Sequence, residues 1–289
     1  MKVISNPLIK KREPFFYLNC AVNKACMVLI PSLIICAFFH QATAQTSLGK
    51  VEVPEWALPG SATHKQVPPP LGFHRASRTD FKPIGIFEGQ SDVGGTLVPG
   101  SSSYDTSTGQ YSITSAGYNV WYTRDEFRYL WKKMSGDVSL ASDINFPDSA
   151  GYGDRKAILV IRQSLDDDSK EAMVALHGGG LVHLAWRPEK EATMTEMRVD
   201  THVGVHDGKN PEDSVMAHAR RLGIEKHGDS FSIYISMEGE PMHLAGPPIQ
   251  LPLDGPFYVG IGFCSHQPIK TDLAQLSNLV LVNTAGRVR

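Results

Sequence analysis

From Ile84 onward the chain alternates short runs of β-branched and aromatic residues with clusters of Gly, Asp, Ser and Asn. Such runs, each bounded by turn-forming residues, are typical of antiparallel β-structure. Only residues 125–131 also fit a helical turn, and no βαβ alternation or internal repeat occurs. We therefore predict an all-β fold, a jelly-roll-like sandwich of two antiparallel sheets, with strands at residues 110–114, 119–122, 129–132, 137–146, 156–163, 172–177, 181–187, 222–226, 231–237, 257–264 and 276–282.

Two connections between these strands have the glycines of tight hairpins. One is the triple glycine at residues 178–180, and the other is Gly228-Asp229. Glycine tolerates the positive φ angles that such turns require. Residues 188–220 are the longest polar interruption, and we expect them to form a loop over one edge of a sheet.

Residue parity separates the two faces of each predicted strand, because successive side chains point to opposite sides of a sheet. One parity set is apolar and predicts the core: Leu159, Ile161, Ala172, Val174, Leu176, Val182, Leu184, Trp186, Phe257, Val259, Ile261 and Phe263. The opposite set places polar side chains over a floor of Gly and Ala. Its candidate ligand-binding residues are Arg162, His177, His183, Arg187, Tyr258 and His266.

This polar set predicts a shallow groove, because glycine within a strand often marks the close approach of a ligand. Guanidinium, imidazole and phenol groups suit sugar hydroxyls and carboxylates, and aromatic rings add apolar contact. An antiparallel sheet with one solvated face produces the same alternation without any ligand. Both interpretations remain open at this point.

Residues 1–44 have the plan of a signal peptide. Basic residues precede an apolar run from Ala25 to Phe39, and Ala42-Thr43-Ala44 follows as a cleavage site. A spanning helix needs about 20 apolar residues, more than this run supplies. We therefore predict cleavage after Ala44, no stable membrane insertion afterwards, and a protein exported to the periplasm or the extracellular space.

The exported chain then consists of a Pro-rich extended leader, residues 45–83, and one sandwich domain, residues 84–289. The whole chain has a formal charge of −2, and loss of residues 1–44 removes five basic residues and one acidic residue, which leaves −6. That balance argues against nucleic acid as a partner. Cys264 is the one cysteine that remains, so no intrachain disulfide forms.

The residues that resemble catalytic or metal centres have simpler interpretations. His177 and His183 flank the glycine turn, but a zinc site needs further ligands and no H-E-x-x-H or C-x-x-C motif occurs, so we interpret them as surface histidines. Asp166-Asp167-Asp168 is the one sign of a cofactor, Ca²⁺, but it lacks the spacing of a calcium loop and fits a turn. Cys264 and His266 share a face, although a lone strand cysteine is more often inert. We predict no cofactor and no catalytic residue.

Four segments resemble a known family. SGDVSLASDINF, RKAILVIRQSLDDDSKEAMVALHGGGLVHLAWR, LGIEKHGDSFSIYIS and GPFYVGIGFCSH are similar to the concanavalin A-like sandwich of bacterial exported proteins. Its relatives include the uncharacterised domain shared with the regulation-of-enolase protein, the C-terminal module of β-xylosidases, and the sandwich attached to TolB-like propellers in proteins labelled biopolymer transporters. The resemblance covers about residues 84–283 and implies a concave sheet face that binds ligands, onto which Arg162 and Arg187 project.

Three functions follow as hypotheses. The first is a non-catalytic exported sandwich that binds carbohydrate or a cell-envelope glycan on its concave face. The second is a glycan hydrolase or lyase with an unrecognised site, although no G-x-S-x-G motif or E-x-D-x-x-E array is present. The third is a periplasmic structural or protein-interaction module that docks through the leader and the 188–220 loop.

Overall fold

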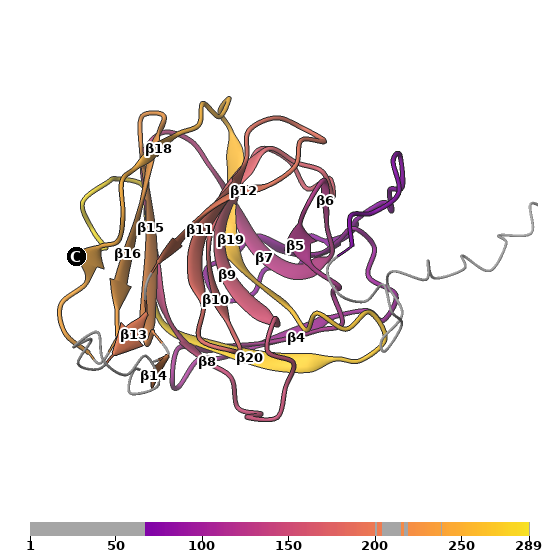
Figure 1. Cartoon of the computed structure of the whole chain (residues 1–289), viewed down its shortest axis with the longest axis horizontal. Coiled ribbons are helices and arrows are strands. Elements are labelled where there is room, and N and C mark those ends of the chain that lie inside the picture. Colours follow the sequence, from indigo (N-terminus) through magenta and orange to yellow (C-terminus); the bar gives the residue numbers. More distant parts are fainter. Residues whose placement is uncertain (1–66, 200, 204–214, 217–218, 238, 289) are drawn as a thin grey trace, which may run out of the picture. The chain divides into compact units, whose positions relative to one another are not determined.

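The structure is a computed structural model that describes residues 67–199, 201–203, 215–216, 219–237 and 239–288. These residues form strands and no helix, and the strands pair in two large antiparallel sheets (Figure 1). The predicted all-β sandwich is therefore confirmed. The expected signal peptide, residues 1–44, lies outside the described residues, as does the leader up to residue 66.

Sheet I contains eight strands, all paired antiparallel. In spatial order they are β1 (Arg78–Asp80), β2 (Gly89–Val93), β7 (Phe127–Met134), β19 (Phe257–Cys264), β9 (Lys156–Arg162), β10 (Glu171–His177), β11 (Val182–Arg187) and β12 (Thr195–Val199).

Sheet II has the spatial order β17 (His243–Leu244), β16 (Ser230–Ser236), β15 (Arg221–His227), β8 (Val138–Asn145), β20 (Asp272–Val282), β4 (Gln110–Ser115) and β3 (Ser101–Asp105), and β18 (Ile249–Gln250) also pairs with β16. Two short ribbons complete the described strands. They are β5 (Val120–Trp121) with β6 (Arg124–Asp125), and β13 (His202–Val203) with β14 (Val215–Met216).

The core between the sheets consists of the apolar parity set that the sequence predicts. From sheet I it takes Leu159, Val174, Leu184 and Ile261, among others, and Trp186 packs against it. Sheet II contributes an equivalent set that includes Ile113, Leu140, Leu222, Ile224, Ile233 and Leu276. Both predicted hairpins are also present, one between β10 and β11 and one between β15 and β16, where Gly228 has a φ of 57°.

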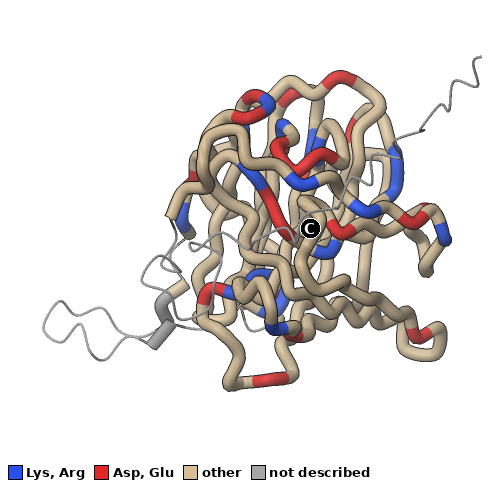
Figure 2. Tube along the Cα trace, turned by 90° about the vertical axis from the view of Figure 1, so that its right-hand side faces the viewer, with Lys and Arg blue, Asp and Glu red and all other residues tan. Residues whose placement is uncertain are grey.

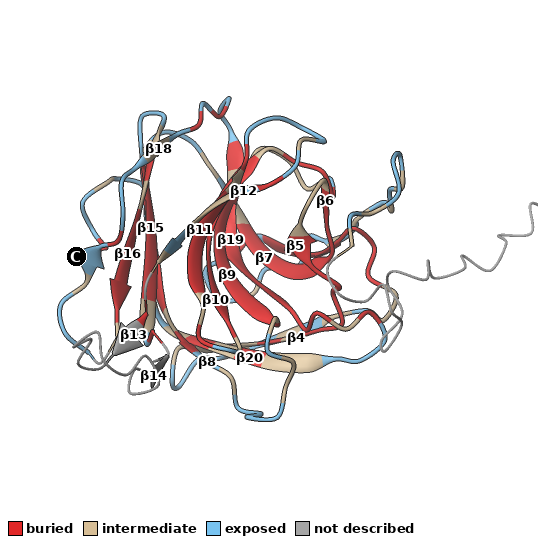
Figure 3. Ribbon diagram, viewed as in Figure 1, coloured by how far each residue is buried: buried red, intermediate tan, exposed pale blue. Residues whose placement is uncertain are grey.

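The outer face of sheet I, which points away from sheet II, is covered rather than open. Val120 and Trp121 of the β5–β6 ribbon pack with its apolar side chains, which include Ile158, Val160 and Met173. Figure 3 shows the central strands of this sheet buried along most of their length. The expected open groove is therefore wrong, and so is the alternative of a solvated face.

The leader adds a second layer to this cover. Phe73 packs against Tyr118, and its ring lies between the guanidinium groups of Arg75 and Arg124, 5.2 and 4.8 Å from them. His74 Nδ1 contacts Asp167 at 3.0 Å. The described part of the leader is thus attached to the domain by charged and aromatic contacts together.

The glycines of β19 serve packing between strands rather than the floor of a groove. A methyl group at Gly260 would overlap the backbone carbonyl oxygen of Leu130 in β7. At Gly262 it would lie 2.7 Å from the ring of Phe127. Both positions therefore exclude larger side chains because a neighbouring strand and ring approach closely.

One local expectation is wrong, and one ambiguous segment is resolved as strand. Residues 195–199, expected within a loop, form β12 at the edge of sheet I. Residues 125–131, whose pattern also fitted a helical turn, contribute to β6 and β7. In both cases pairing with a neighbouring strand decides the local structure, a contribution that sequence pattern alone does not contain.

Acidic and basic residues are interspersed along the described chain (Figure 2), in keeping with a formal charge of −2. Within the part of the chain that the structure describes, no helix is long and apolar enough to cross a membrane.

Candidate functional site

The outer face of sheet I has polar residues at both ends of its central strands. At one end, which we call the arginine end, Arg162 lies opposite Glu171 and Tyr258, and Glu171 lies opposite Arg187. At the other, the histidine end, Lys156 lies opposite His177 and Cys264. Strand register therefore places the predicted site residues on one face, but in two separate groups.

At the arginine end Asp125 of β6 binds both arginines. Its carboxylate accepts two hydrogen bonds from Arg187, at 2.7 and 2.8 Å, and one from Arg162 at 3.1 Å. Glu171 completes the group, with Oε2 lying 3.1 Å from Arg162 Nε. All four side chains are completely buried.

Two arginines and two carboxyl groups thus meet in an interior where an unpaired charge is costly. Burial raises the pKa of Glu171 to about 7, against the opposing effect of Arg162. For Arg187, burial acts to lower the pKa, but the Asp125 carboxylate outweighs it and raises the pKa above its ordinary value. The guanidinium groups expected to meet a ligand instead fasten the β5–β6 ribbon to the sheet.

Tyr258, also a predicted ligand contact, lies at the margin of this end. Its half-buried ring stands edge-on to Trp131, with ring centroids 5.1 Å apart, and Lys133 Nζ lies 5.6 Å from its centroid. It contributes packing here, and a contact between Tyr258 and a ligand remains a prediction.

At the histidine end the polar groups have far fewer partners. His183 Nδ1 lies 2.8 Å from Glu196 Oε2, and His177 Nδ1 lies 3.6 Å from Asp154 Oδ1, too far for a hydrogen bond. The Nε2 atoms of both imidazoles have no hydrogen-bond partner among the described residues. Both side chains are buried, so the interpretation as surface histidines is wrong.

Aromatic rings cover the histidines. The half-buried indole of Trp121 lies flat on the His183 ring, with centroids 5.4 Å apart and planes within 6°. Tyr152 stacks on His266 in the same way at 5.1 Å, and Tyr118 stacks on it at 5.4 Å. The Lys156 ammonium also lies 5.4 Å from the Trp121 ring centroid. The histidine end is therefore closed by rings, whereas the arginine end is closed by opposite charge.

Burial fixes the protonation states of these groups. It is the main cause that lowers the pKa of His177 to about 3 and also lowers the pKa of His183. The hydrogen bond from His183 lowers the pKa of Glu196 to about 2. At neutral pH both imidazoles are therefore neutral. Because Nδ1 of His183 donates to a carboxylate, its Nε2 carries a lone pair and is a hydrogen-bond acceptor.

The thiol of Cys264 is not a nucleophile at neutral pH. Burial raises its pKa to about 11, and thiolate is the reactive form of cysteine. The side chain packs with the apolar residues of the outer face. The interpretation of Cys264 as an inert hydrophobe fits this environment.

Asp166, Asp167 and Asp168 form a turn between β9 and β10 whose carboxylates have cationic partners. Arg124 Nε lies 3.2 Å from Asp167, and Lys190 Nζ lies 2.8 and 3.1 Å from Asp166 and Asp168. His74, Asp168 and Glu191 do bring donor atoms within 4.8 Å of one another. The Lys190 ammonium already contacts the Asp168 carboxylate of this set. That contact favours the turn interpretation over a Ca²⁺ site.

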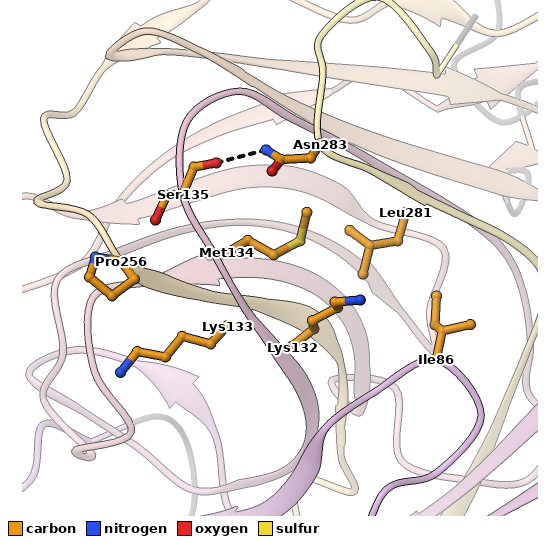
Figure 4. Close-up of a pocket in the computed structure, with 8 residues that line it drawn as sticks. All are labelled: Ile86, Lys132, Lys133, Met134, Ser135, Pro256, Leu281 and Asn283. Atoms are coloured by element: carbon orange, nitrogen blue, oxygen red, sulfur yellow. Dashed lines mark hydrogen bonds between the residues drawn. The ribbon is translucent and has the colours of Figure 1, made fainter.

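A separate open depression of about 570 Å³ lies at the ends of β7 and β20 (Figure 4). Its lining combines apolar side chains, including Met134 and Leu281, with Lys132 and Lys133. Asn283 Nδ2 donates to the carbonyl oxygen of Ser135 at 2.7 Å and so is already engaged. The histidine end remains the stronger candidate site. Buried imidazole nitrogens without hydrogen-bond partners among the described residues lie there beneath an aromatic ring, whereas the unpartnered atoms of Arg162 and Glu171 at the arginine end belong to side chains that form ion pairs.

Several residues of the two groups escaped the prediction from sequence. Lys156 begins a predicted strand and shares parity with Arg162, so parity alone could have placed it on the same face as the predicted site residues. Trp121 lies in the predicted strand at residues 119–122, but nothing in the sequence assigns it to His183. Asp125 binds Arg162 and Arg187 from 37 and 62 positions earlier in the chain. Glu171 binds Arg162 across two neighbouring strands. No sequence motif marks such pairs.

No family model matches this chain, and no curated protein matches it. Solved structures similar to it include a functionally unknown protein from Saccharomyces cerevisiae (12% identity, 73% of this chain and 97% of that one, TM-score 0.46). The carbohydrate binding module CBM66 from Bacillus subtilis has 17% identity over 63% and 91% of the two chains, with a TM-score of 0.40. The xylan β-1,4-xylosidase from Bacillus halodurans C-125 has 14% identity over 71% and 38%, with a TM-score of 0.43. Likeness at this level carries no functional argument, which has to come from the chain's own geometry.

Replacing Asp125 with alanine is expected to destabilise the fold by about 3–5 kcal/mol, because it leaves two buried guanidinium groups without their carboxylate. Chemical denaturation measures the loss. Asp143→Ala is the matched control, since Asp143 pairs with Arg221 at a partly exposed site and such pairs contribute about 1 kcal/mol or less. Equal losses in the two variants would contradict the structural role of Asp125.

Stability is expected to fall as the pH is lowered from about 6.5 to 3, partly because of His177. Its folded-state pKa of about 3 lies below the ordinary 6.5, so in this window the unfolded chain binds a proton that the folded chain does not. His177→Gln removes that contribution and should flatten the dependence of the denaturation midpoint on pH, while His183 preserves part of it. His227→Gln, at an exposed site on sheet II, is the comparison variant. An unchanged profile in His177→Gln would contradict the burial of a neutral imidazole.

Proposed function

We propose that this chain is an exported, non-catalytic protein that binds a saccharide at the histidine end of the outer face of sheet I. The observation that carries the proposal is the presence there of buried polar atoms without partners, His177 Nε2 and His183 Nε2, beneath an aromatic side chain. A buried polar group without a hydrogen bond costs about 1–3 kcal/mol. Bound hydroxyl groups would remove that cost.

A saccharide fits the chemistry of this end. Its hydroxyl groups donate to neutral imidazole nitrogens and accept from an ammonium group, and its C–H faces pack on aromatic rings. The histidine end supplies these elements in His177, His183, Lys156 and Trp121. All but Trp121 come from paired strands of sheet I, so the polar groups are held on a rigid support.

In this proposal Trp121 covers the entrance to the histidine end. It lies on a ribbon of only two residue pairs, Val120 with Asp125 and Trp121 with Arg124. Asp125 fixes one end of that ribbon to the arginines, while the half-buried indole packs on the outer face and contacts the His183 ring and the Lys156 ammonium. A sugar ring that enters beneath the indole and packs against it reaches both Nε2 atoms.

Catalysis is the second candidate, favoured by the carboxylates behind the two imidazoles. Asp154 faces His177, and Glu196 binds His183, as in sites where a carboxylate orients a histidine base. An efficient general base has a pKa near the working pH, and the pKa of His177, at about 3, is far below it. Binding is therefore the better proposal, and turnover of the same glycans is the test that separates the two.

Export completes the proposal and rests on residues 1–44, with their basic region, apolar run and Ala42-Thr43-Ala44 site. Expression in a bacterial host should yield a chain that begins at Gln45, which mass spectrometry of the secreted or periplasmic protein identifies. A chain that keeps Met1 and stays in the cytoplasm contradicts this part.

Saccharide binding is tested with a glycan array followed by calorimetry on the glycans retained. Trp121→Ala and His183→Ala are expected to weaken binding at least about tenfold, because each removes a direct contact with the ligand. Binding should also change the tryptophan fluorescence of the wild type, and Trp121→Phe should lose most of that change.

His227→Ala is the matched control, since His227 lies on sheet II at an exposed site and also pairs with a carboxylate, Asp137. It should bind like the wild type. Failure of every glycan to bind at millimolar concentration would overturn the proposal, and so would equal affinities for wild type, Trp121→Ala and His183→Ala.

A further inference from the structure

Lys156 differs from the other buried cations on the outer face of sheet I. It is only 2% exposed, yet it makes no ion pair and no side-chain hydrogen bond with the described residues. Its ammonium group contacts the face of Trp121, 5.4 Å from the ring centroid. Arg162 and Arg187, on the same face, each have a carboxylate partner at 2.7 to 3.1 Å.

The carboxylates nearest to Lys156 have other partners. Glu196 is within 2.8 Å of both His183 and Arg198, and Asp154 faces His177 at 3.6 Å. Asp125 binds the arginines at the far end of the sheet. On the remaining side of Lys156 stands Cys264, whose thiol is neutral. The ammonium group is therefore buried without a compensating negative charge.

We propose that the histidine end selects acidic saccharides, and that the carboxylate of a uronate-type sugar pairs with Lys156. Hydroxyl groups of the same sugar donate to Nε2 of His177 and His183. This inference rests on the proposed function, because it names the class of saccharide that the same site binds. The ligand would supply the negative charge that the fold provides for Arg162 and Arg187 but not for Lys156.

A carboxylate fits this end better than a phosphate or sulfate. Sites for those anions commonly combine arginines, helix N-termini or successive backbone amides. Here one compact ammonium group lies next to two neutral imidazoles, and the described residues contain no helix. One positive charge and two hydrogen-bond acceptors match one carboxylate and two hydroxyl groups, as on a uronate ring.

The pairing would be effective because the site is dry. An ion pair strengthens as the effective dielectric constant falls, and the desolvation of Lys156 has already occurred in the folded protein. The same burial lowers the pKa of Lys156 in the free protein. A bound carboxylate would raise it again, so binding and protonation of Lys156 favour each other.

The test compares oligogalacturonate with its full methyl ester, and oligoglucuronate with its ester, by calorimetry at neutral pH. The two members of each pair share a skeleton and differ in the methyl group that removes the negative charge. Wild-type protein should bind the acid at least about tenfold more tightly than the ester, as expected for a charge-assisted hydrogen bond. Raising the salt concentration should weaken the binding of the acid more than the binding of the ester.

Lys156→Met should lose the preference for the acid, so that the acid and the ester bind this variant with similar affinity. Lys226→Met is the matched control, because Lys226 is also a buried lysine over an aromatic ring, 5.1 Å from the Phe257 centroid, but in sheet II. It should keep the preference. Thermal unfolding of both variants checks the fold, and Lys156→Arg, which keeps the charge, provides a second variant that should still prefer the acid.

The outcomes separate this inference from the proposed function. Equal wild-type affinity for acid and ester would overturn the inference and leave saccharide binding in place. A preference for the acid that survives in a folded Lys156→Met would also overturn it. If no acid, no ester and no neutral glycan binds, the proposed function itself is overturned.

Discussion

The hydrogen bonds from Arg162 and Arg187 to Asp125 are the interaction on which the outer half of the molecule depends. Covering a sheet face that carries charged side chains is costly unless the charges find partners. Asp125 supplies such a partner from the β5–β6 ribbon. This ribbon therefore both covers the sheet and neutralises the arginines. The same ribbon places Trp121, four residues earlier, over His183. One ion-pair group thus sets the position of the ring that closes the candidate site.

The two ends of this face differ in how their buried polar groups are partnered. At the arginine end the two guanidinium groups pair with Asp125 and Glu171 within the chain. At the histidine end the Nε2 atoms of His177 and His183 lack hydrogen-bond partners among the described residues, and the Lys156 ammonium contacts an aromatic ring and no carboxylate there. Polar groups left in this state lower stability and are retained most readily where a ligand completes them. We therefore regard the histidine end as the functional part.

Much of the fold was predictable, because strand alternation depends on local sequence. Leu159, Val174 and Ile261 enter the core as parity requires, and the parity of His177 and His183 places them on the opposite face. Parity does not say whether that face is open. Its cover depends on Asp125 and on leader residues such as Phe73, which meet the sheet through contacts distant in sequence. The parity pattern therefore missed the pairing of Arg162 and Arg187 with Asp125 and predicted an open groove there.

The central claim is that Nε2 of His177 and of His183 accepts hydrogen bonds from a bound sugar. Side-chain ¹⁵N chemical shifts, measured at neutral pH by long-range ¹H–¹⁵N correlation, report on these atoms directly. Both Nε2 signals should show unprotonated nitrogen in the free protein and should move on addition of oligogalacturonate, while Nδ1 of His183 stays protonated. Nε2 signals that remain unchanged at saturating ligand, or a His177 ring that is doubly protonated at pH 7, would contradict the account.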